Sequence, residues 1–181
     1  MDASILIGGF GGQGVQTLGK LLAYAANDAD QHVTFYPAYG GEMRGGTSNC
    51  TVVISDRKIG APARNLCDYV LALNSPSSKR FESRVKPGGV MIVNSSLVKD
   101  LPTRTDIQVI QLPINDLAAE MGNMRAANVI LYGFFTSYSQ VVAEDSARNT
   151  LKERLGRNES YAQMNEQAFL KGKALADNIK K

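Results

Sequence analysis

Ser4-Ile5-Leu6-Ile7-Gly8-Gly9-Phe10-Gly11-Gly12-Gln13-Gly14-Val15 is the stretch that decides the fold. It opens on a short apolar run, residues 5–7, which is typical of a buried strand. A glycine cluster follows, and beyond it apolar residues recur at the spacing of one helical face: Val15, Leu18, Leu21, Leu22, Ala25 and Ala26. The order of strand, glycine turn and helix places free backbone N–H groups at the positive end of a helix, where a phosphate can bind.

Three functions remain open for this turn. Gly9, Gly11 and Gly14 satisfy the G-x-G-x-x-G pattern, in which a side chain would obstruct the turn or the ligand. A nicotinamide-binding unit should also end its second strand on an acidic residue that holds the ribose. The expected second strand, residues 32–36, runs instead into Pro37. Nicotinamide binding is therefore disfavoured against a phosphate site and against a turn that only lets helix and strand pack closely.

The segment from residue 36 to residue 48 is the second unusual stretch. It holds four glycines, a proline and two tyrosines, and so cannot form a regular element. One interpretation is a structured loop in which Glu42 pairs with Arg44. The interpretation we prefer is that Arg44 presents its guanidinium to a carboxylate, a phosphate or a partner subunit, because loops of this kind carry function. The candidate residues of this loop are Tyr39, Glu42, Met43, Arg44, Gly45 and Gly46.

Strand-like and helix-like runs alternate along the rest of the chain. Further strands are expected at residues 49–55, 69–73, 90–93 and 107–112, and further helices at 75–85, 114–121, 122–135, 144–155 and 161–179. This alternation predicts an α/β fold, one three-layer domain over residues 1–181 with a mostly parallel sheet and helices on both faces. Only a loop separates the strand at 49–55 from the one before it, so we expect it to run antiparallel to its neighbours.

Ligands of such sheets bind at the carboxyl ends of the strands. Four features of the sequence fall at that edge: the glycine turn, the loop at 39–46, Asn74 and Asn94. Their convergence predicts a binding site there.

Composition excludes several classes of protein. The net charge of +3 comes from basic residues that are scattered except at the C-terminal end, without a basic, aromatic-rich stripe, which argues against nucleic-acid binding. Cys50 and Cys67 are too few for a metal cluster and are expected to be small core residues in a reducing compartment. His32 is expected to be structural. No signal pattern and no apolar run of membrane-spanning length occurs, so we expect a cytoplasmic protein without a membrane span.

Two motifs together resemble the gamma subunit of 2-oxoacid:ferredoxin oxidoreductases. In that family a G-x-G-G-Q-G turn is followed by Y-G-x-E-x-R-G-G, as in the turn at 9–14 and the loop at 39–46 here. The resemblance spans essentially the whole chain and includes two later helices, through Asn123, Asn128, Gly133, Asn165, Ala168 and Gly172.

The resemblance implies a multi-subunit enzyme that decarboxylates a 2-oxoacid on thiamine diphosphate and releases an acyl-CoA. Electrons pass through iron–sulfur clusters to ferredoxin. This chain lacks cysteine clusters, a thiamine diphosphate motif and an acid–base dyad, so it carries no catalytic or metal-binding residue of its own. Thiamine diphosphate, magnesium and the clusters are expected in the alpha, beta and ferredoxin-like partner subunits.

By resemblance, this chain would bind coenzyme A and complete the assembly. The residues expected to hold the coenzyme are Gly9, Phe10, Gly11, Gly12, Gln13 and Gly14. The alternative is a purely structural docking subunit without a ligand of its own. Arg44 is expected to face a partner subunit, and its contact with coenzyme A, substrate or protein stays open. Also open are the identity of the 2-oxoacid, where 2-oxoglutarate or a branched-chain acid is favoured, and whether the isolated chain forms a homodimer.

Overall fold

The structure, a computed structural model, describes residues 1–39 and 47–180. Its strands are β1 (Asp2–Phe10), β2 (His32–Tyr39), β3 (Thr47–Ser55), β4 (Cys67–Ala72), β5 (Val85–Asn94) and β6 (Gln108–Leu112). Its helices are α1 (Val15–Asp28), α2 (Ser75–Phe81), α3 (Ile114–Glu120), α4 (Ala127–Ser139), α5 (Glu144–Leu155) and α6 (Glu159–Ile179). Two short 3₁₀ helices, η1 (Glu82–Arg84) and η2 (Met124–Ala126), precede β5 and α4.

The six strands form one mixed sheet in the order β2-β3-β1-β4-β5-β6. β1, β4, β5 and β6 pair in parallel, while β3 runs antiparallel to both β1 and β2. The mostly parallel sheet and the antiparallel direction of the strand at 49–55 are therefore confirmed. Because the parallel strands end at the same edge, the connections that follow them are brought together there.

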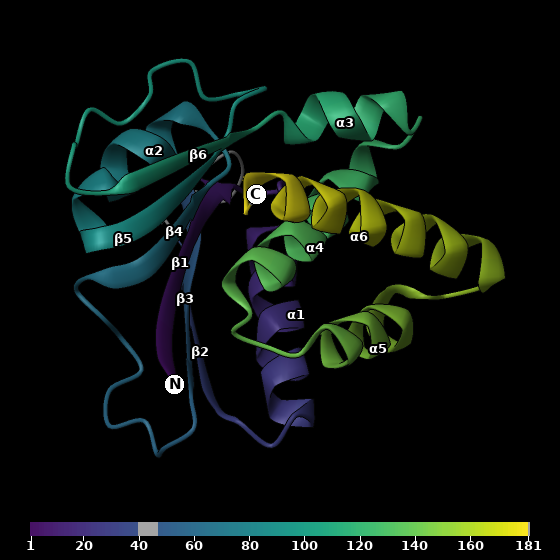
Figure 1. Ribbon diagram of the computed structural model, residues 1–181, viewed down its shortest axis with the longest axis horizontal. Helices are drawn as coiled ribbons and strands as arrows, with labels where there is room; N and C mark the ends of the chain where they lie inside the picture. The colour runs from purple at the N-terminus through teal and green to yellow at the C-terminus, as the bar shows by residue number, and fades with distance from the viewer. Residues whose placement is uncertain (40–46, 181) are drawn as a thin grey trace.

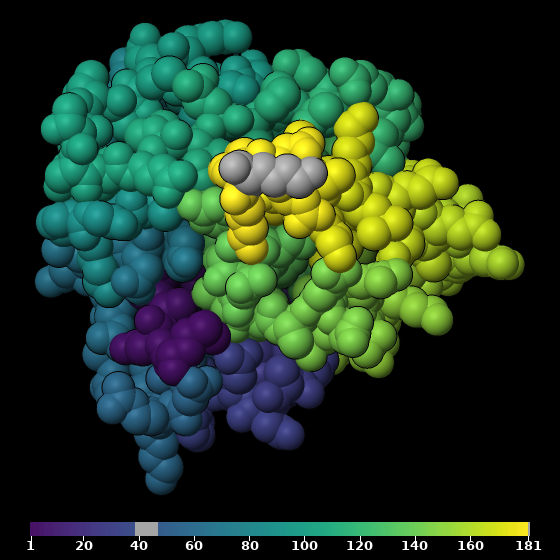
Figure 2. All heavy atoms as spheres, viewed as in Figure 1, coloured from purple at the N-terminus to yellow at the C-terminus, as the bar shows by residue number. Residues whose placement is uncertain are grey.

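Helices cover both faces of the sheet, so the expected three layers are confirmed (Figure 1). Successive residues of a strand point to opposite faces. Ile5 and Ile7 of β1 thus belong to the core under α1, α4, α5 and α6. Leu6 faces the other way and packs in a second core with Phe81 of α2. In the space-filling view, segments far apart in sequence meet on one surface, the purple N-terminal atoms beside blue and green ones (Figure 2).

Helix α1 lies close against the sheet because it carries a glycine at the contact. A Cβ on Gly19 would lie 2.5 Å from Cys50 Sγ and 2.9 Å from the Phe35 ring. Cys50 is fully buried, and burial raises the pKa of its thiol to about 12. Cys67 is also free and buried, so both cysteines are core residues as expected.

The helix expected at residues 75–85 is shorter than predicted. α2 ends at Phe81, a 3₁₀ turn follows, and Val85 already belongs to β5, where it pairs with Cys67. Arg104 fixes this turn because its Nη1 donates to Glu82 O and Val85 O at 2.9 and 2.8 Å. The next β4–β5 pair joins Tyr69 to Val90, so residues 86–89 bulge out of the ladder. The Pro-Gly-Gly run thus lies inside a strand.

Asp68 ties β1 to β4 and β5 at the end of the sheet away from the glycine turn. Ser4 N and Oγ donate to its Oδ2 at 2.8 and 2.7 Å, and Lys86 Nζ donates to its Oδ1 at 2.7 Å. Burial acts to raise the pKa of Asp68, but the bonds from Lys86 and Ser4 outweigh it and hold that pKa below its usual value. The carboxylate therefore stabilises the fold above its unfolded-state pKa, and this contribution fades as the pH falls through the native value.

We expect Asp68→Asn to lower the unfolding free energy by about 1 kcal/mol near neutral pH, a fall in Tm of roughly 3 °C. Thermal unfolding followed by circular dichroism at several pH values measures this. The difference from the parent chain should begin to shrink below about pH 4, where the unfolded carboxyl is protonated, and should disappear once the native Asp68 is protonated as well. Asp100→Asn is the control, because the Asp100–Lys79 pair is exposed. Equal falls in Tm for both variants would contradict a stabilising role for the Asp68 carboxylate.

Within residues 1–39 and 47–180, no helix combines the length and the apolar character that a membrane span requires.

Candidate functional site

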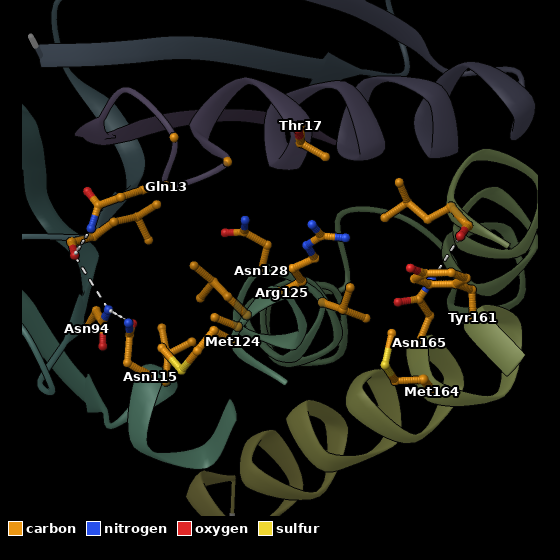
Figure 3. A pocket seen from close by; sticks show the side chains of 18 of the residues that line it. Gln13, Thr17, Asn94, Asn115, Met124, Arg125, Asn128, Tyr161, Met164 and Asn165 are labelled. Atoms are coloured by element: carbon orange, nitrogen blue, oxygen red, sulfur yellow. Dashed lines mark hydrogen bonds between the residues drawn. The ribbon is translucent and has the colours of Figure 1, made fainter. Parts of the chain in front are cut away.

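A cleft of about 690 Å³ opens at the carboxyl edge of the sheet (Figure 3). One wall is the turn between β1 and α1, and another is the edge residues Leu73, Asn94 and Asn115. The start of α4 and the connection from α5 to α6 close the remaining sides. Segments from the first, middle and last parts of the chain thus meet around one cavity.

The six residues of the glycine turn have different surroundings. Gly9 and Phe10 belong to β1, and a Cβ on Gly9 would lie 2.8 Å from the Val15 side chain. Gly11 and Gly12 are exposed, and a Cβ on either would have nothing within 4 Å. The turn residues that line the cleft are Gly12, Gln13 and Gly14.

The first turn of α1 leaves its N–H groups without a side-chain cap. Gly14 is the N-cap residue, with a left-handed φ of 76°, and no acidic residue lies in the first turn. The first N–H groups of a helix lack intrahelical acceptors and carry the positive end of the dipole. A Cβ on Gly14 would overlap Asn128 Nδ2, so the missing side chain lets this amide lie against the turn.

Gln13 and Asn74 hold the turn in place. Gln13 Oε1 accepts hydrogen bonds from Phe10 N and from Asn74 Nδ2, both at 2.7 Å. Asn74 Oδ1 in turn accepts from Ser77 N at 2.9 Å and caps α2. The side chain of Gln13 therefore fixes the glycine turn to the start of the helix on the other face.

Asn94 is a buried polar residue of the cleft wall, with 3% of its surface exposed. Its Nδ2 donates to Asn115 Oδ1 at 2.7 Å and to Leu73 O at 3.5 Å. Its Oδ1 is buried and finds no donor among the described residues. An unpaired buried acceptor is costly, so this oxygen has capacity for a ligand donor. The expected placement of Asn74 and Asn94 at this edge is confirmed.

The charged residues that line the cleft are basic. Arg125 lies in η2, whose start is capped by Asn123 Oδ1 accepting from Arg125 N at 3.0 Å. Arg157 lies in the connection from α5 to α6. Neither an aspartate nor a glutamate is among the described residues that line the cleft. The cavity therefore favours an anion.

Much of this wall has no signal in the sequence patterns that predict the site. The polar, charged, tyrosine and methionine residues of the lining that lie outside the predicted site are Thr17, Asn115, Met124, Arg125, Asn128, Arg157, Tyr161, Met164 and Asn165. Thr17 lies in the first turn of α1, and the others come from α3, η2, α4, α6 and the connection from α5 to α6. The available signal was the asparagine caps Asn123 and Asn158, which mark where η2 and α6 begin.

The second predicted segment lies mostly outside the described residues: Glu42, Met43, Arg44, Gly45 and Gly46 fall within 40–46. Its two flanks are described. Tyr39 ends β2 opposite Ser48, and Thr47 pairs with Phe10, the last residue of β1. Both flanks therefore meet the edge at which the glycine turn begins.

In the part of the chain that the structure describes, no three His, Cys, Asp or Glu side chains are grouped as metal ligands.

Comparison with known proteins identifies the family. The model of the pyruvate ferredoxin/flavodoxin oxidoreductase family matches residues 4–175. The chain belongs to this family. It is 37% identical over 152 residues to the ketoisovalerate oxidoreductase subunit VorA of Methanothermobacter marburgensis. That alignment covers 83% of this chain and 32% of VorA, so the chain spans about a third of that relative's length.

Solved structures share the fold. The gamma subunit of a keto/oxoacid ferredoxin oxidoreductase from Geobacter sulfurreducens PCA superposes with a TM-score of 0.86 at 29% identity, covering 98% of each chain. The 2-oxoglutarate:ferredoxin oxidoreductase of Magnetococcus marinus, solved with 2-oxoglutarate, coenzyme A and succinyl-CoA, gives 0.89 at 24% identity. That match covers 98% of this chain and 31% of the other, and it shows the fold alone.

Proposed function

We propose that this chain is the gamma-type subunit of a 2-oxoacid:ferredoxin oxidoreductase and that it binds coenzyme A in the assembled enzyme. The pyrophosphate would lie on the uncapped N-terminus of α1, beside Gly12 and Gly14. The observation that carries this proposal is the charge of the cleft: free helix N–H groups and two arginines surround a cavity whose described lining holds no acidic side chain. Such a cavity suits a phosphorylated ligand.

Two relatives support the proposal. The Geobacter sulfurreducens protein, which matches this chain end to end, is a gamma subunit. The Magnetococcus marinus enzyme, which has the same fold over this region, was solved with coenzyme A. The argument that the cleft suits coenzyme A does not depend on these two relatives. It rests on the uncapped start of α1 and on the buried Asn94 Oδ1, which lacks a donor among the described residues.

The complete reaction would need partner subunits. Alpha, beta and ferredoxin-like subunits would hold thiamine diphosphate, magnesium and the iron–sulfur clusters, and ferredoxin would accept the electrons. The similarity to a ketoisovalerate oxidoreductase subunit favours a branched-chain 2-oxoacid as the substrate of that complex. The role of this chain would be to hold coenzyme A and to complete the assembly.

Gly12→Asp tests the binding proposal. We expect it to weaken coenzyme A binding by tenfold or more, on the order of 1.4 kcal/mol, because a carboxylate would face the pyrophosphate. Isothermal titration of the assembled complex with coenzyme A measures this. Gly12→Asn is the matched control. Asparagine has the size of aspartate and would take the same left-handed φ of 92° at this position, but it carries no charge.

Gly88→Asp is the second control, because Gly88 has a left-handed φ of 76° and open space and does not line the cleft. Unchanged affinity in Gly12→Asp, or an equal loss in Gly12→Asn, would refute an anion at the turn.

A docking role without a ligand is the second candidate, and one observation favours it. Packing alone explains Gly9 and Gly14, since their Cβ positions are taken by Val15 and by Asn128. On this alternative, Gly12→Asp should disrupt assembly before it alters affinity. Size-exclusion chromatography with the partner subunits separates the two, because intact complexes with weakened coenzyme A binding would exclude it.

A further inference from the structure

The cleft is chemically different at its two ends. At the sheet edge its polar groups are uncharged amides, those of Gln13, Asn94 and Asn115. Away from this edge stand Arg125 and Arg157, and beyond Arg125 the cleft reaches Tyr161 and Met164 of α6. Figure 3 shows the amide end and the α6 end on opposite sides of Arg125 and Asn128, with the first turn of α1 above. The uncapped helix N-terminus therefore lies over a cleft whose polar groups are neutral at the sheet edge and cationic from Arg125 onward.

The cationic end continues into a second hollow. This hollow, of about 350 Å³, is lined by Asn123, Arg125, Ser160, Tyr161 and Met164, three of which also line the main cleft. Tyr161 is 38% exposed and the neighbouring Met124 is 54% exposed, a large apolar surface to leave in water at the mouth of a cavity. A tyrosine ring and an arginine guanidinium are the groups on which a nucleobase stacks.

The neutral end has the opposite character. Asn94 Oδ1 is a buried acceptor without a donor in the described part of the chain, and Asn115 holds the amide of Asn94 in that orientation. Uncharged amide groups of a ligand, with their N–H donors, suit such a wall. Phosphate groups do not, because none of the described residues of the lining places a cationic side chain among these three amides.

We propose that coenzyme A lies across the cleft in one direction, with its adenosine 3′-phosphate end at Arg125 and Tyr161 and its pantetheine arm along Asn94 and Asn115. This inference rests on the proposed binding of coenzyme A. The pyrophosphate joins the two halves of the molecule and would lie at the α1 N-terminus between them. The charged half thus meets the basic residues, and the half with two amides meets the amide wall.

A crossed experiment with two ligands and two variants tests the direction. Coenzyme A and adenosine 3′,5′-bisphosphate, which lacks the pantetheine arm, are titrated calorimetrically into the assembled complex. Arg125→Met should weaken both ligands by about tenfold, the loss of one charge-assisted contact. Asn115→Ala should weaken coenzyme A by about fivefold and leave the bisphosphate within about twofold of the parent.

Arg154→Met is the matched control, because Arg154 stacks on Tyr24 and does not line the cleft. It should leave both affinities unchanged. Thermal unfolding of each variant confirms that the fold is retained.

Three results would overturn the direction: the reversed pattern, an equal loss of both ligands in both variants, or no loss in either variant while Gly12→Asp still weakens coenzyme A. The last result leaves the proposed function standing. If Gly12→Asp also binds coenzyme A like the parent, the proposed function fails and the direction fails with it.

Discussion

Gly172→Ala is expected to destabilise the fold by about 3 kcal/mol, at the upper end of the cost of overpacking. A Cβ at this position would overlap Ile130 O and lie 2.6 Å from Phe134 N. The obstacle is the backbone of α4, so the added methyl can be accommodated only if α4 and α6 separate. Gly133 occupies the facing position, and a Cβ there would overlap Phe169 O. The two helices therefore cross at the distance that two glycines permit.

The sign of this effect is informative. An exposed helical glycine replaced by alanine gains about 1 kcal/mol from helix propensity, so a stabilised variant would contradict the crossing. Urea denaturation gives the free energy of unfolding. Gly60→Ala is the control, because nothing lies within 4 Å of its Cβ position and its φ is not left-handed. It should stay within about 0.5 kcal/mol of the parent.

Tyr132→Ala should cost about 3–5 kcal/mol, the range for deleting a buried aromatic side chain. Tyr132 is fully buried, and its ring packs edge to face against Phe169 at a centroid distance of 5.9 Å. Its Oη lies 3.3 Å from Ala147 O and 3.5 Å from Leu21 O, so this residue of α4 also contacts α1 and α5. Burial raises the pKa of Tyr132, and Asp28 adds to the shift, so the phenol stays protonated and remains a donor.

Tyr132→Phe separates the ring from the hydroxyl. It keeps the packing and removes the two long hydrogen bonds, so we expect a loss of only about 1 kcal/mol. Denaturation of both variants under the same conditions supplies the comparison. If the two variants lost equal stability, the hydroxyl rather than the ring would hold the three helices together.

The sequence predicts the order of the elements and the edge at which the site lies. Periodicity marks α1 because its buried positions repeat at one helical face, and a short connection is enough to predict an antiparallel β3. Val85 shows where periodicity fails. It suits the apolar face of a helix, yet it pairs with Cys67 in the sheet, and that pairing depends on a bulge and on Arg104, which is distant in sequence.

The candidate site was predictable only where one segment carries it. The glycine turn follows β1 and Asn94 ends β5, so their position at the edge can be deduced from strand order. Arg125 and Arg157 follow no strand, and α4, α5 and α6 must pack on the sheet before either reaches the cleft. The basic side of the cleft is thus a product of tertiary packing.

The cleft also has a consequence for synthesis of the protein. One of its walls belongs to the turn before α1, and another to the connection that leads into α6, the last helix described. During translation, the residues of the first wall would leave the ribosome long before the residues of the second wall. The proposed capture of a nucleotide by both walls would therefore have to wait until translation has passed α6, so that only chains in which α6 has been made could hold the ligand.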